Sequence, residues 1–277
     1  KTTLLTFLAG QAMRHRDLKV FFFDRHRGAE IFTRAIGGAY VGFEGDEKNV
    51  SLNPFDTANT PNNRAFLRRW LKSITMVDDA LSEKEIGRAV TTAFDYLRPE
   101  ERIMKNLYKS CFSPTGNMRR ELFRWINPDQ YGNIFNAEND SLDLSAKRFM
   151  AFDFTHIFED ETLAPAVISY IMHRIMSETG DTGVPSLIMI DETAPMLKHP
   201  MFRDYFIIGL QEGRKKRQAY LCAFQQPNII DKLGVGEVIR GQCQTIIFFR
   251  NPQAMPEDYA NWNLTQREIE FIFGKSY

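Results

Sequence analysis

Five short apolar runs stand out in the pattern of hydrophobic and polar positions. They read KVFFFD, KRFMAFDFT, SLIMIDE, QAYLCAF and QTIIFF, at residues 19–24, 147–155, 186–192, 218–224 and 244–249. Their apolar residues are nearly continuous, which is typical of parallel strands covered on both faces. Helical patterns lie between them, at 2–14, 163–178 and 202–216. Strands that alternate with helices predict an α/β fold, doubly wound around a mostly parallel central sheet.

One region interrupts this alternation. Between about residues 62 and 126 helical patterns recur in NRAFLRRWLKSITMV, SEKEIGRAVTTAFDYL and RIMKNLYKSCF, and no convincing strand appears. Ser82, with Glu85 three residues later, is typical of a capping box at a helix start. Apolar residues at three- and four-residue spacing, such as Phe66 and Trp70, predict a helical lobe with its own apolar core.

This helical region divides the chain into three segments. We expect the first part of the sheet domain at 1–55, an all-helical insert at 56–140 and the second part of the sheet domain at 141–277. The insert is entered through LNPF and left through YGNIFNAEND. The sheet domain is therefore discontinuous in sequence.

Composition narrows the classes of protein only a little. Of 277 residues, 43% are hydrophobic and 25% charged, as in ordinary globular proteins. The 35 basic and 35 acidic residues give a formal net charge of zero, which argues against bulk binding of a polyanion such as DNA. The three cysteines are far apart and form no metal-binding or disulfide pattern. No apolar run approaches the ~18 residues of a membrane span.

An acidic pair ends one of the predicted strands. In SLIMIDE, four apolar residues lead into Asp191 and Glu192. Ligands bind at the carboxyl ends of parallel strands in such folds. In a nucleotide hydrolase the aspartate would organise Mg²⁺ and the glutamate would orient or deprotonate the attacking water. The alternative is a strand that ends in two ordinary surface acids.

The first residues of the chain fit the same chemistry. A phosphate-binding loop reads G-x-x-x-x-G-K-[ST] and leads into a helix, with the lysine on the β/γ-phosphates and the hydroxyl on Mg²⁺. Lys1 and Thr2, followed by Thr3 and an apolar helical stretch, match the end of that pattern. We expect the glycines of the loop just before residue 1. Together with the Asp-Glu strand, the pattern predicts binding of ATP and Mg²⁺, with Thr2 and Asp191 at the metal.

Two further polar elements are candidates for catalysis. The run at 218–224 ends in Gln225, whose amide would sense the γ-phosphate or hold the attacking water; the alternative is a loop glutamine. EGRKKR closes the helix before that run. Cations at a helix C-terminus are favoured by the helix dipole, so a solvated helix end is one interpretation. The other is an arginine, Arg214 ahead of Arg217, supplied to the nucleotide of a neighbouring subunit.

The order of several motifs resembles that of one family. FFFDRHRGAEIFTRAIGGAY, SLNPF, NRAFLRRWL, FDFTHIFED, LIMIDE, GRKKR and FQQP follow one another as in the VirB-type, CagE and TrbE ATPases of type IV secretion and conjugation systems, in the HerA/FtsK-like branch of RecA-fold motors. The resemblance covers essentially the whole chain. It implies a RecA-like P-loop NTPase fold with an all-helical insert, and the C-terminal motor domain of a longer protein.

The resemblance also implies roles for individual residues. It matches Lys1 and Thr2 to the phosphate loop, Asp191 and Glu192 to the catalytic acid pair, Arg214 and Lys215 to the Arg-Lys motif, and Gln225 to the glutamine motif. Lys215 is thereby a candidate for nucleotide binding. His26 stands where the family often carries a second acid.

The predicted function is an ATP-hydrolysing motor of a type IV secretion or conjugation system, which powers machine assembly or substrate transport. The resemblance implies a hexameric ring at the cytoplasmic side of the bacterial inner membrane, with other secretion-system components as partners and DNA or protein as substrate. A DNA-pumping translocase and a non-hydrolysing nucleotide-binding scaffold are the alternatives. Glu192 discriminates against the scaffold, because scaffolds often lose the catalytic acid.

Overall fold

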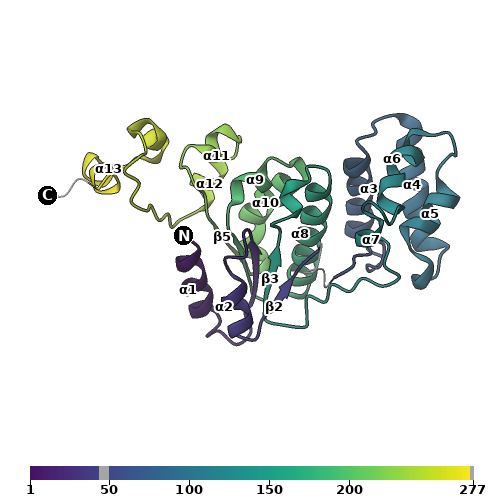
Figure 1. The fold of residues 1–277 in the computed structure, drawn as a ribbon, viewed down its shortest axis with the longest axis horizontal. Coiled ribbons are helices and arrows are strands. Elements are labelled where there is room, and N and C mark those ends of the chain that lie inside the picture. Colours follow the sequence, from purple (N-terminus) through teal and green to yellow (C-terminus); the bar gives the residue numbers. More distant parts are fainter. Residues whose placement is uncertain (44–49, 275–277) are drawn as a thin grey trace.

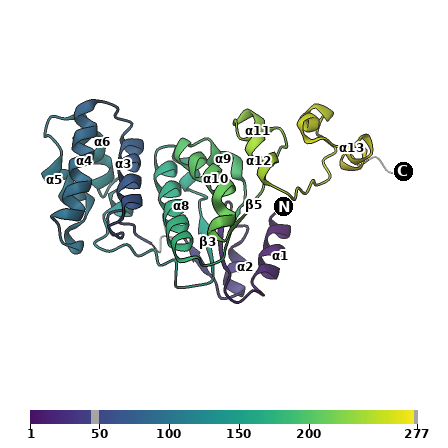
Figure 2. The same cartoon turned by 180° about the vertical axis from the view of Figure 1, so that it is seen from behind.

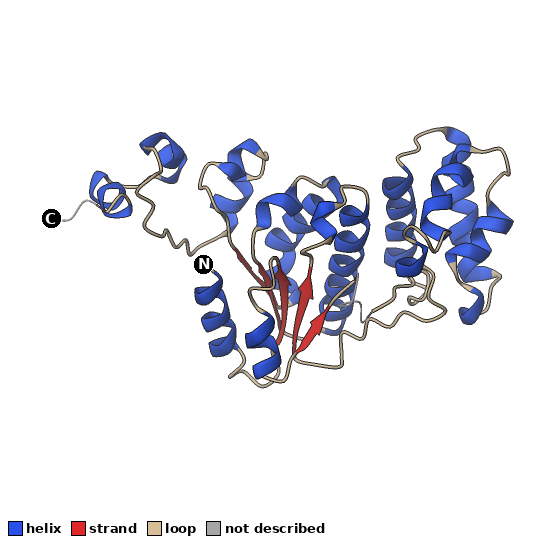
Figure 3. Cartoon of the chain, in the orientation of Figure 1, coloured by secondary structure: helices blue, strands red, loops and turns tan. Residues whose placement is uncertain are grey.

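The computed structural model describes residues 1–43 and 50–274. Its centre is a five-stranded sheet in the order β2-β3-β1-β4-β5, in which every neighbouring pair runs parallel. The strands are β1 (Lys19–Asp24), β2 (Ala39–Val41), β3 (Phe149–Asp153), β4 (Ser186–Ile190) and β5 (Gln218–Cys222). Four of the five apolar runs therefore form strands of one parallel sheet, as predicted (Figure 3).

Helices cover both faces of the sheet (Figures 1 and 2). On one face α1 (Thr2–Ala12) and α2 (Glu30–Ala35) pack against Val20 and Phe22 of β1. On the other, α8 (Leu163–Thr182) and α10 (Pro200–Glu212) share an apolar cluster with Phe21 and Phe23. Successive side chains of a strand point to opposite faces. A strand covered on both sides therefore needs an apolar residue at each position, which explains the continuous runs.

The remaining helices outside residues 61–135 are short. They are α9 (Thr193–Leu197), α11 (Ile229–Lys232), α12 (Gly236–Gln242), α13 (Gln266–Ile272) and the 3₁₀ helices η3 (Ile157–Glu159), η4 (Gly213–Lys216) and η5 (Pro256–Trp262). Across the described ranges, no helix is long and apolar enough to cross a membrane.

The described residues from 61 to 135 contain helices and no strand. They form α3 (Pro61–Thr75), α4 (Ala80–Asp95), η2 (Pro99–Glu101), α5 (Met104–Cys111), α6 (Asn117–Ile126) and α7 (Gly132–Phe135). The expected capping box is wrong. Asp79 is the N-cap of α4 and accepts from Ser82 N at 3.0 Å, while the buried Glu85 carboxylate accepts from Ser113 N at 2.9 Å. A carboxylate cap directly before Ala80 starts the helix earlier than the hydroxyl of Ser82 would.

These helices stand beside the sheet in Figure 1, and α3 joins them to it through α8. Trp70 Nε1 donates to the Ala166 carbonyl oxygen at 3.0 Å, and the Phe66 ring stacks on His173 with 3.9 Å between centroids. Both aromatic side chains belong to the same buried cluster as the α8 face of the sheet. The helical segment therefore shares the core of the sheet domain and does not have the separate core expected from its sequence.

Trp70→Ala should lower the free energy of unfolding by about 3–5 kcal/mol, because it leaves a large cavity at the contact between α3 and α8. Trp70 is 0% exposed. We expect one cooperative transition in urea, shifted as a whole, since the core is continuous. Arg68→Ala, at an exposed position of the same helix, is the matched control. A loss below 1 kcal/mol for Trp70→Ala would contradict this account of the contact.

The predicted strand at 244–249 is wrong. The described residues there have no regular structure, and Ile246, Ile247 and Phe249 are 43%, 56% and 47% exposed. In Figure 1 the chain leaves α12 here and leads away from the sheet to α13. A strand satisfies its N–H and C=O groups through a neighbouring strand. Among the described residues no strand pairs with this segment, so its apolar pattern does not produce one.

Candidate active site

Polar residues from three neighbouring strands meet at the carboxyl end of the sheet. Asp24 ends β1 and lies opposite Asp153 at the end of β3, and Asp191 follows β4 on the other side of β1. These three aspartates are 0%, 6% and 5% exposed. Buried carboxylates are costly unless they have partners. This end of the sheet is therefore the candidate ligand-binding site, as expected for the carboxyl ends of parallel strands.

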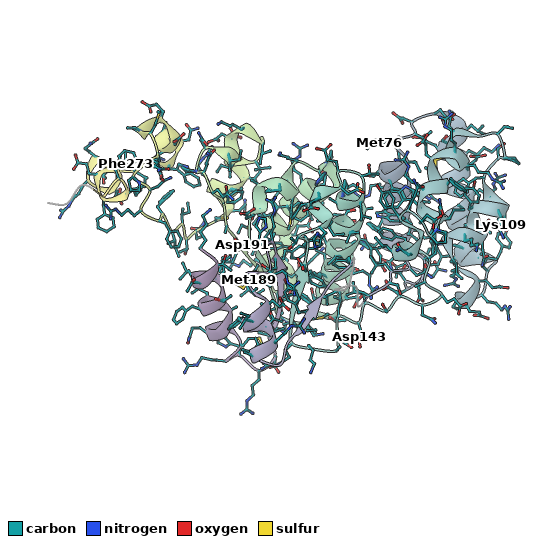
Figure 4. All side chains as sticks on the ribbon, in the orientation of Figure 1. Met76, Lys109, Asp143, Met189, Asp191 and Phe273 are labelled. Atoms are coloured by element: carbon teal, nitrogen blue, oxygen red, sulfur yellow. The ribbon has the colours of Figure 1, made fainter. Side chains whose placement is uncertain are left out.

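The first turn of α1 contacts this acidic cluster. Thr2 Oγ1 donates a hydrogen bond to Asp191 Oδ2 at 2.7 Å, although the residues are 189 positions apart. Figure 4 shows Asp191 beside that turn, above Met189 of β4. Burial lowers the pKa of the Lys1 ammonium, and the nearby carboxylates of Asp191 and Glu192 act in the opposite direction. The structure thus brings together Lys1, Thr2 and the Asp-Glu pair. Thr3 lies exposed in the same turn.

Glu192 is held from two sides. Its Oε1 accepts from Gln225 Nε2 at 2.6 Å, and its Oε2 pairs with Arg25 Nη1 at 2.6 Å. Its backbone has φ 57° and ψ 60°, a left-handed conformation that costs free energy in a residue with a side chain. The contact with Gln225 agrees with the predicted neighbourhood of the glutamine and the acid. Arg25 was missed by the sequence reasoning, although a cation directly after an apolar strand was a usable signal.

Asp24 occupies the least solvated position of the cluster. Burial raises the pKa of its carboxyl to about 6, although its Oδ2 accepts from Ala29 N at 3.0 Å and from Tyr40 OH at 2.9 Å. Its Oδ1 is buried and has no partner among the described residues. A Cβ at Gly28 would come within 2.9 Å of Thr2 Cγ2, so a larger residue there would displace the side chain of Thr2.

His26 lies in the loop that follows Asp24. Its backbone N–H donates to Thr155 Oγ1 at 3.0 Å, and its φ is 63°. The next residue, Arg27, is also left-handed, with φ 57°. Two consecutive left-handed residues turn the chain sharply after β1 and set the position of Arg25.

These residues suit Mg²⁺ and a nucleotide. In P-loop enzymes the metal is held by the hydroxyl of the loop and by an aspartate at a strand end, and it keeps several waters and phosphate oxygens as ligands. Thr2 and Asp191 are a hydroxyl and a strand-end aspartate of this kind, and they are in contact. The unpartnered Oδ1 of Asp24 is a free acceptor in the same cluster. In the described part of the chain, no three His, Cys, Asp or Glu side chains form a metal-binding group by themselves.

Arg214 and Lys215 lie elsewhere. They belong to η4, which precedes β5, whereas Gln225 follows β5. A five-residue strand spans roughly 16 Å. Both side chains are exposed at the amino end of the sheet. The structure does not bring Arg214 or Lys215 to the acids of their own chain, so any role at a nucleotide requires a second subunit.

A parallel α/β sheet with a Thr-Asp contact and an Asp-Glu pair at its carboxyl end defines a RecA-like P-loop NTPase fold. A solved structure, "Structure of VirB4 of Thermoanaerobacter pseudethanolicus", has the same fold, with a TM-score of 0.68 and 13% identity over 88% of this chain and 71% of that one. The predicted fold class is confirmed.

Comparison of sequences identifies the relatives. The chain is 30% identical to "Type IV secretion system protein virB4" of Bartonella henselae, over 98% of this chain and 35% of that protein. It is 28% identical to "Protein virB4" of Agrobacterium fabrum (98% and 35%) and 27% identical to "Conjugal transfer protein TrbE" of Rhizobium radiobacter (98% and 34%). No protein-family model matches the chain.

The chain is thus a homologue of the VirB4 and TrbE proteins of type IV secretion and conjugal transfer, and the resemblance seen in its motifs is confirmed. It spans about a third of the length of these relatives, since it covers 34–35% of them.

Proposed function

We propose that the chain is the ATP-hydrolysing motor part of a type IV secretion or conjugation ATPase, which powers machine assembly or substrate transport. The observation that carries the proposal is the contact between Thr2 and Asp191 at 2.7 Å, next to Glu192 with its Gln225 partner at 2.6 Å. These contacts support the proposal because they bring together, from distant parts of the sequence, side chains of the types that nucleotide hydrolysis uses. The names of the homologues supply the biological setting.

Each residue has one part in the proposed mechanism. Lys1 binds the β/γ-phosphates, with Thr3 beside it in the first turn of α1. Thr2 and Asp191 would hold Mg²⁺, which would supply positive charge to neutralise the phosphates. Glu192 accepts a proton from the attacking water. Gln225 orients that water and the Glu192 carboxylate.

The proposal extends to the assembly. We propose a hexameric ring in which Arg214 and Lys215 of one subunit face the nucleotide of the next. Closed rings place one patch of a subunit against a different patch of its neighbour, which suits a site that a single chain leaves incomplete. Other secretion-system components at the cytoplasmic face of the inner membrane are the proposed partners, and DNA or protein is the proposed substrate.

Lys1→Ala in the full-length protein should weaken ATP binding about ten- to a hundredfold, because a hydrogen-bonded cation on the phosphates is worth ~1.5–3 kcal/mol. Thr2→Ala should chiefly weaken the dependence of binding on Mg²⁺. Titration calorimetry with ATP, with and without Mg²⁺, measures both effects. Thr6→Ala, one turn further along α1, is the control and should bind as the wild type does. Unchanged affinity in Lys1→Ala would remove the first residues from the site and refute the proposed nucleotide chemistry.

The two alternative functions give different results in one assay. A secretion motor hydrolyses ATP without DNA, whereas a DNA-pumping translocase is strongly stimulated by double-stranded DNA. A scaffold binds ATP and does not hydrolyse it. Measuring turnover with and without DNA therefore separates the three. The zero net charge argues against the DNA translocase, and Glu192 of the acidic pair argues against the scaffold. Both features therefore favour the secretion motor.

A further inference from the structure

Arg25 is paired with Glu192, the group that acts as the base in the proposed mechanism. Its Nη1 lies 2.6 Å from Glu192 Oε2, while Gln225 binds the other oxygen of that carboxylate at 2.6 Å. Glu192 can accept a proton from water only through these two oxygens. In this arrangement both of them already accept hydrogen bonds, and one is paired with a full positive charge.

The guanidinium of Arg25 has binding capacity left over. It lies over the Phe158 ring, with 5.2 Å between Cζ and the ring centroid. Its Nε–H is buried and has no partner among the described residues. An arginine carries five N–H donors in a flat fork, which matches carboxylate or phosphate oxygens in pairs. An unpaired buried donor costs free energy, so a ligand that supplied an acceptor here would gain by it.

Arg25 is also close to the proposed phosphate site. Its partner Glu192 directly follows Asp191, and Asp191 Oδ2 accepts a hydrogen bond from Thr2 Oγ1 in the first turn of α1 at 2.7 Å. The pair of Arg25 and Glu192 therefore lies at the carboxyl end of the sheet, next to the contact between α1 and Asp191. The side chains of Arg25 and Glu192 are 29% and 19% exposed, so an anion can approach the pair from solvent.

We propose that Arg25 recognises the terminal (γ) phosphate of a bound nucleoside triphosphate. Without nucleotide it pairs with Glu192; with a nucleoside triphosphate bound it pairs with the terminal phosphate and releases Glu192 to accept the proton of the attacking water. The inference rests on the proposed nucleotide chemistry of this site. A terminal phosphate carries more charge than a carboxylate and offers two oxygens to the guanidinium fork, so it competes well for Arg25. A nucleoside diphosphate lacks the γ-phosphate, so the ion pair between Arg25 and Glu192 stays in place when it binds.

The alternative is a purely structural ion pair, in which Arg25 and Glu192 connect the ends of β1 and β4 and do not respond to nucleotide. A partly exposed pair of this kind contributes little to stability. It would be the same with and without nucleotide, and it would not distinguish a triphosphate from a diphosphate. The two accounts therefore differ in a binding measurement that does not depend on catalysis.

The test is the affinity of Arg25→Met for a non-hydrolysable ATP analogue and for ADP, both with Mg²⁺, by titration calorimetry. Methionine keeps an apolar stem over Phe158 and removes the charge. We expect analogue binding to weaken about ten- to a hundredfold and ADP binding to change less than twofold. Arg25→Lys should lie between wild type and Arg25→Met, because it keeps the charge without the fork. Arg27→Met is the control: it lies in the same loop but pairs with Glu30 at 2.8 Å.

Equal changes for the analogue and ADP, or none for either, would overturn the role of Arg25. If wild type binds both nucleotides in a Lys1-dependent way while Arg25→Met is unaffected, this inference alone fails. If the full-length wild type binds neither nucleotide, the proposed function fails with it.

A double-mutant cycle measures the release of Glu192 directly. The shifts in urea midpoint of Arg25→Met and Glu192→Gln should be non-additive without nucleotide and additive with saturating analogue. Non-additive shifts in both conditions would mean that the pair never opens, and would also overturn the inference.

Discussion

Glu192→Gln lowers ATP turnover by about 10²–10⁴-fold and leaves ATP affinity within about twofold of wild type, if Glu192 is the general base. Glutamine keeps the size of the side chain and can still accept hydrogen bonds from Arg25 and Gln225. It cannot accept the proton of the attacking water at neutral pH. The change therefore separates chemistry from binding, which is what a residue that acts on water rather than on phosphate requires.

Single-turnover hydrolysis and calorimetry on the same preparation measure the two effects. Glu83→Gln is a suitable control, because Glu83 pairs with Lys72 at 2.7 Å in the helical segment, away from the site. Its turnover should equal that of the wild type. A kcat for Glu192→Gln within threefold of wild type would remove Glu192 from the role of base. No turnover in the wild type, with ATP still bound, would instead favour the scaffold.

The meeting of Thr2 and Asp191 could be predicted from the sequence. An apolar strand without alternation must be covered on both faces, so it belongs to a parallel sheet whose carboxyl ends gather at one edge. A Lys-Thr pair before a helix is a phosphate-loop signal, and that chemistry has to reach the same edge. The two patterns are far apart in the chain, but each one specifies its end of the sheet independently. The contact at 2.7 Å follows from both.

The role of Arg25 could not be predicted in the same way. Its contact with Glu192 requires β1 and β4 to be neighbours, which is a property of strand order and not of either strand. It also requires left-handed backbone at His26 and Arg27. Neither residue is a glycine, so the sequence does not predict this conformation. Tertiary contacts such as the bond from His26 N to Thr155 Oγ1 hold that turn.

The prediction of a strand at 244–249 was wrong for a related reason. Its composition is that of a strand, but a strand exists only where a neighbour completes its hydrogen bonds. The local sequence pattern specifies the tendency to form a strand, and the rest of the fold determines whether a neighbouring strand is present. The same limit applies to Arg214, whose exposure was expected from its hydrophilic surroundings but whose place at the amino end of the sheet depends on the course of β5.

That placement leads to the prediction with the largest expected effect: Arg214→Ala should reduce hydrolysis by about 10³–10⁵-fold, the range found for an arginine supplied to a transferring phosphate in trans. Arg214 is exposed and lies at the end of β5 opposite to Gln225, so it cannot reach Glu192 of its own chain. In a closed ring a patch at one end of a subunit can face a different patch of the next. ATP affinity of the isolated subunit should not change, since in the proposed ring Arg214 contacts only the nucleotide of the neighbouring subunit.

Mixing two inactive variants decides whether Arg214 acts in trans. Arg214→Ala subunits supply Glu192 but no arginine, and Glu192→Gln subunits supply the arginine but no base. Where the two are neighbours in the required order, one of the shared sites contains both groups, so partial activity should return on mixing and should peak near equal amounts. Arg217→Ala is the matched control: its Nη1 donates to the Gly183 carbonyl oxygen at 3.2 Å within the chain, and its turnover should stay within a few-fold of wild type. If mixed rings form, as shown by native mass spectrometry, and no activity returns, Arg214 does not complete the site of a neighbour.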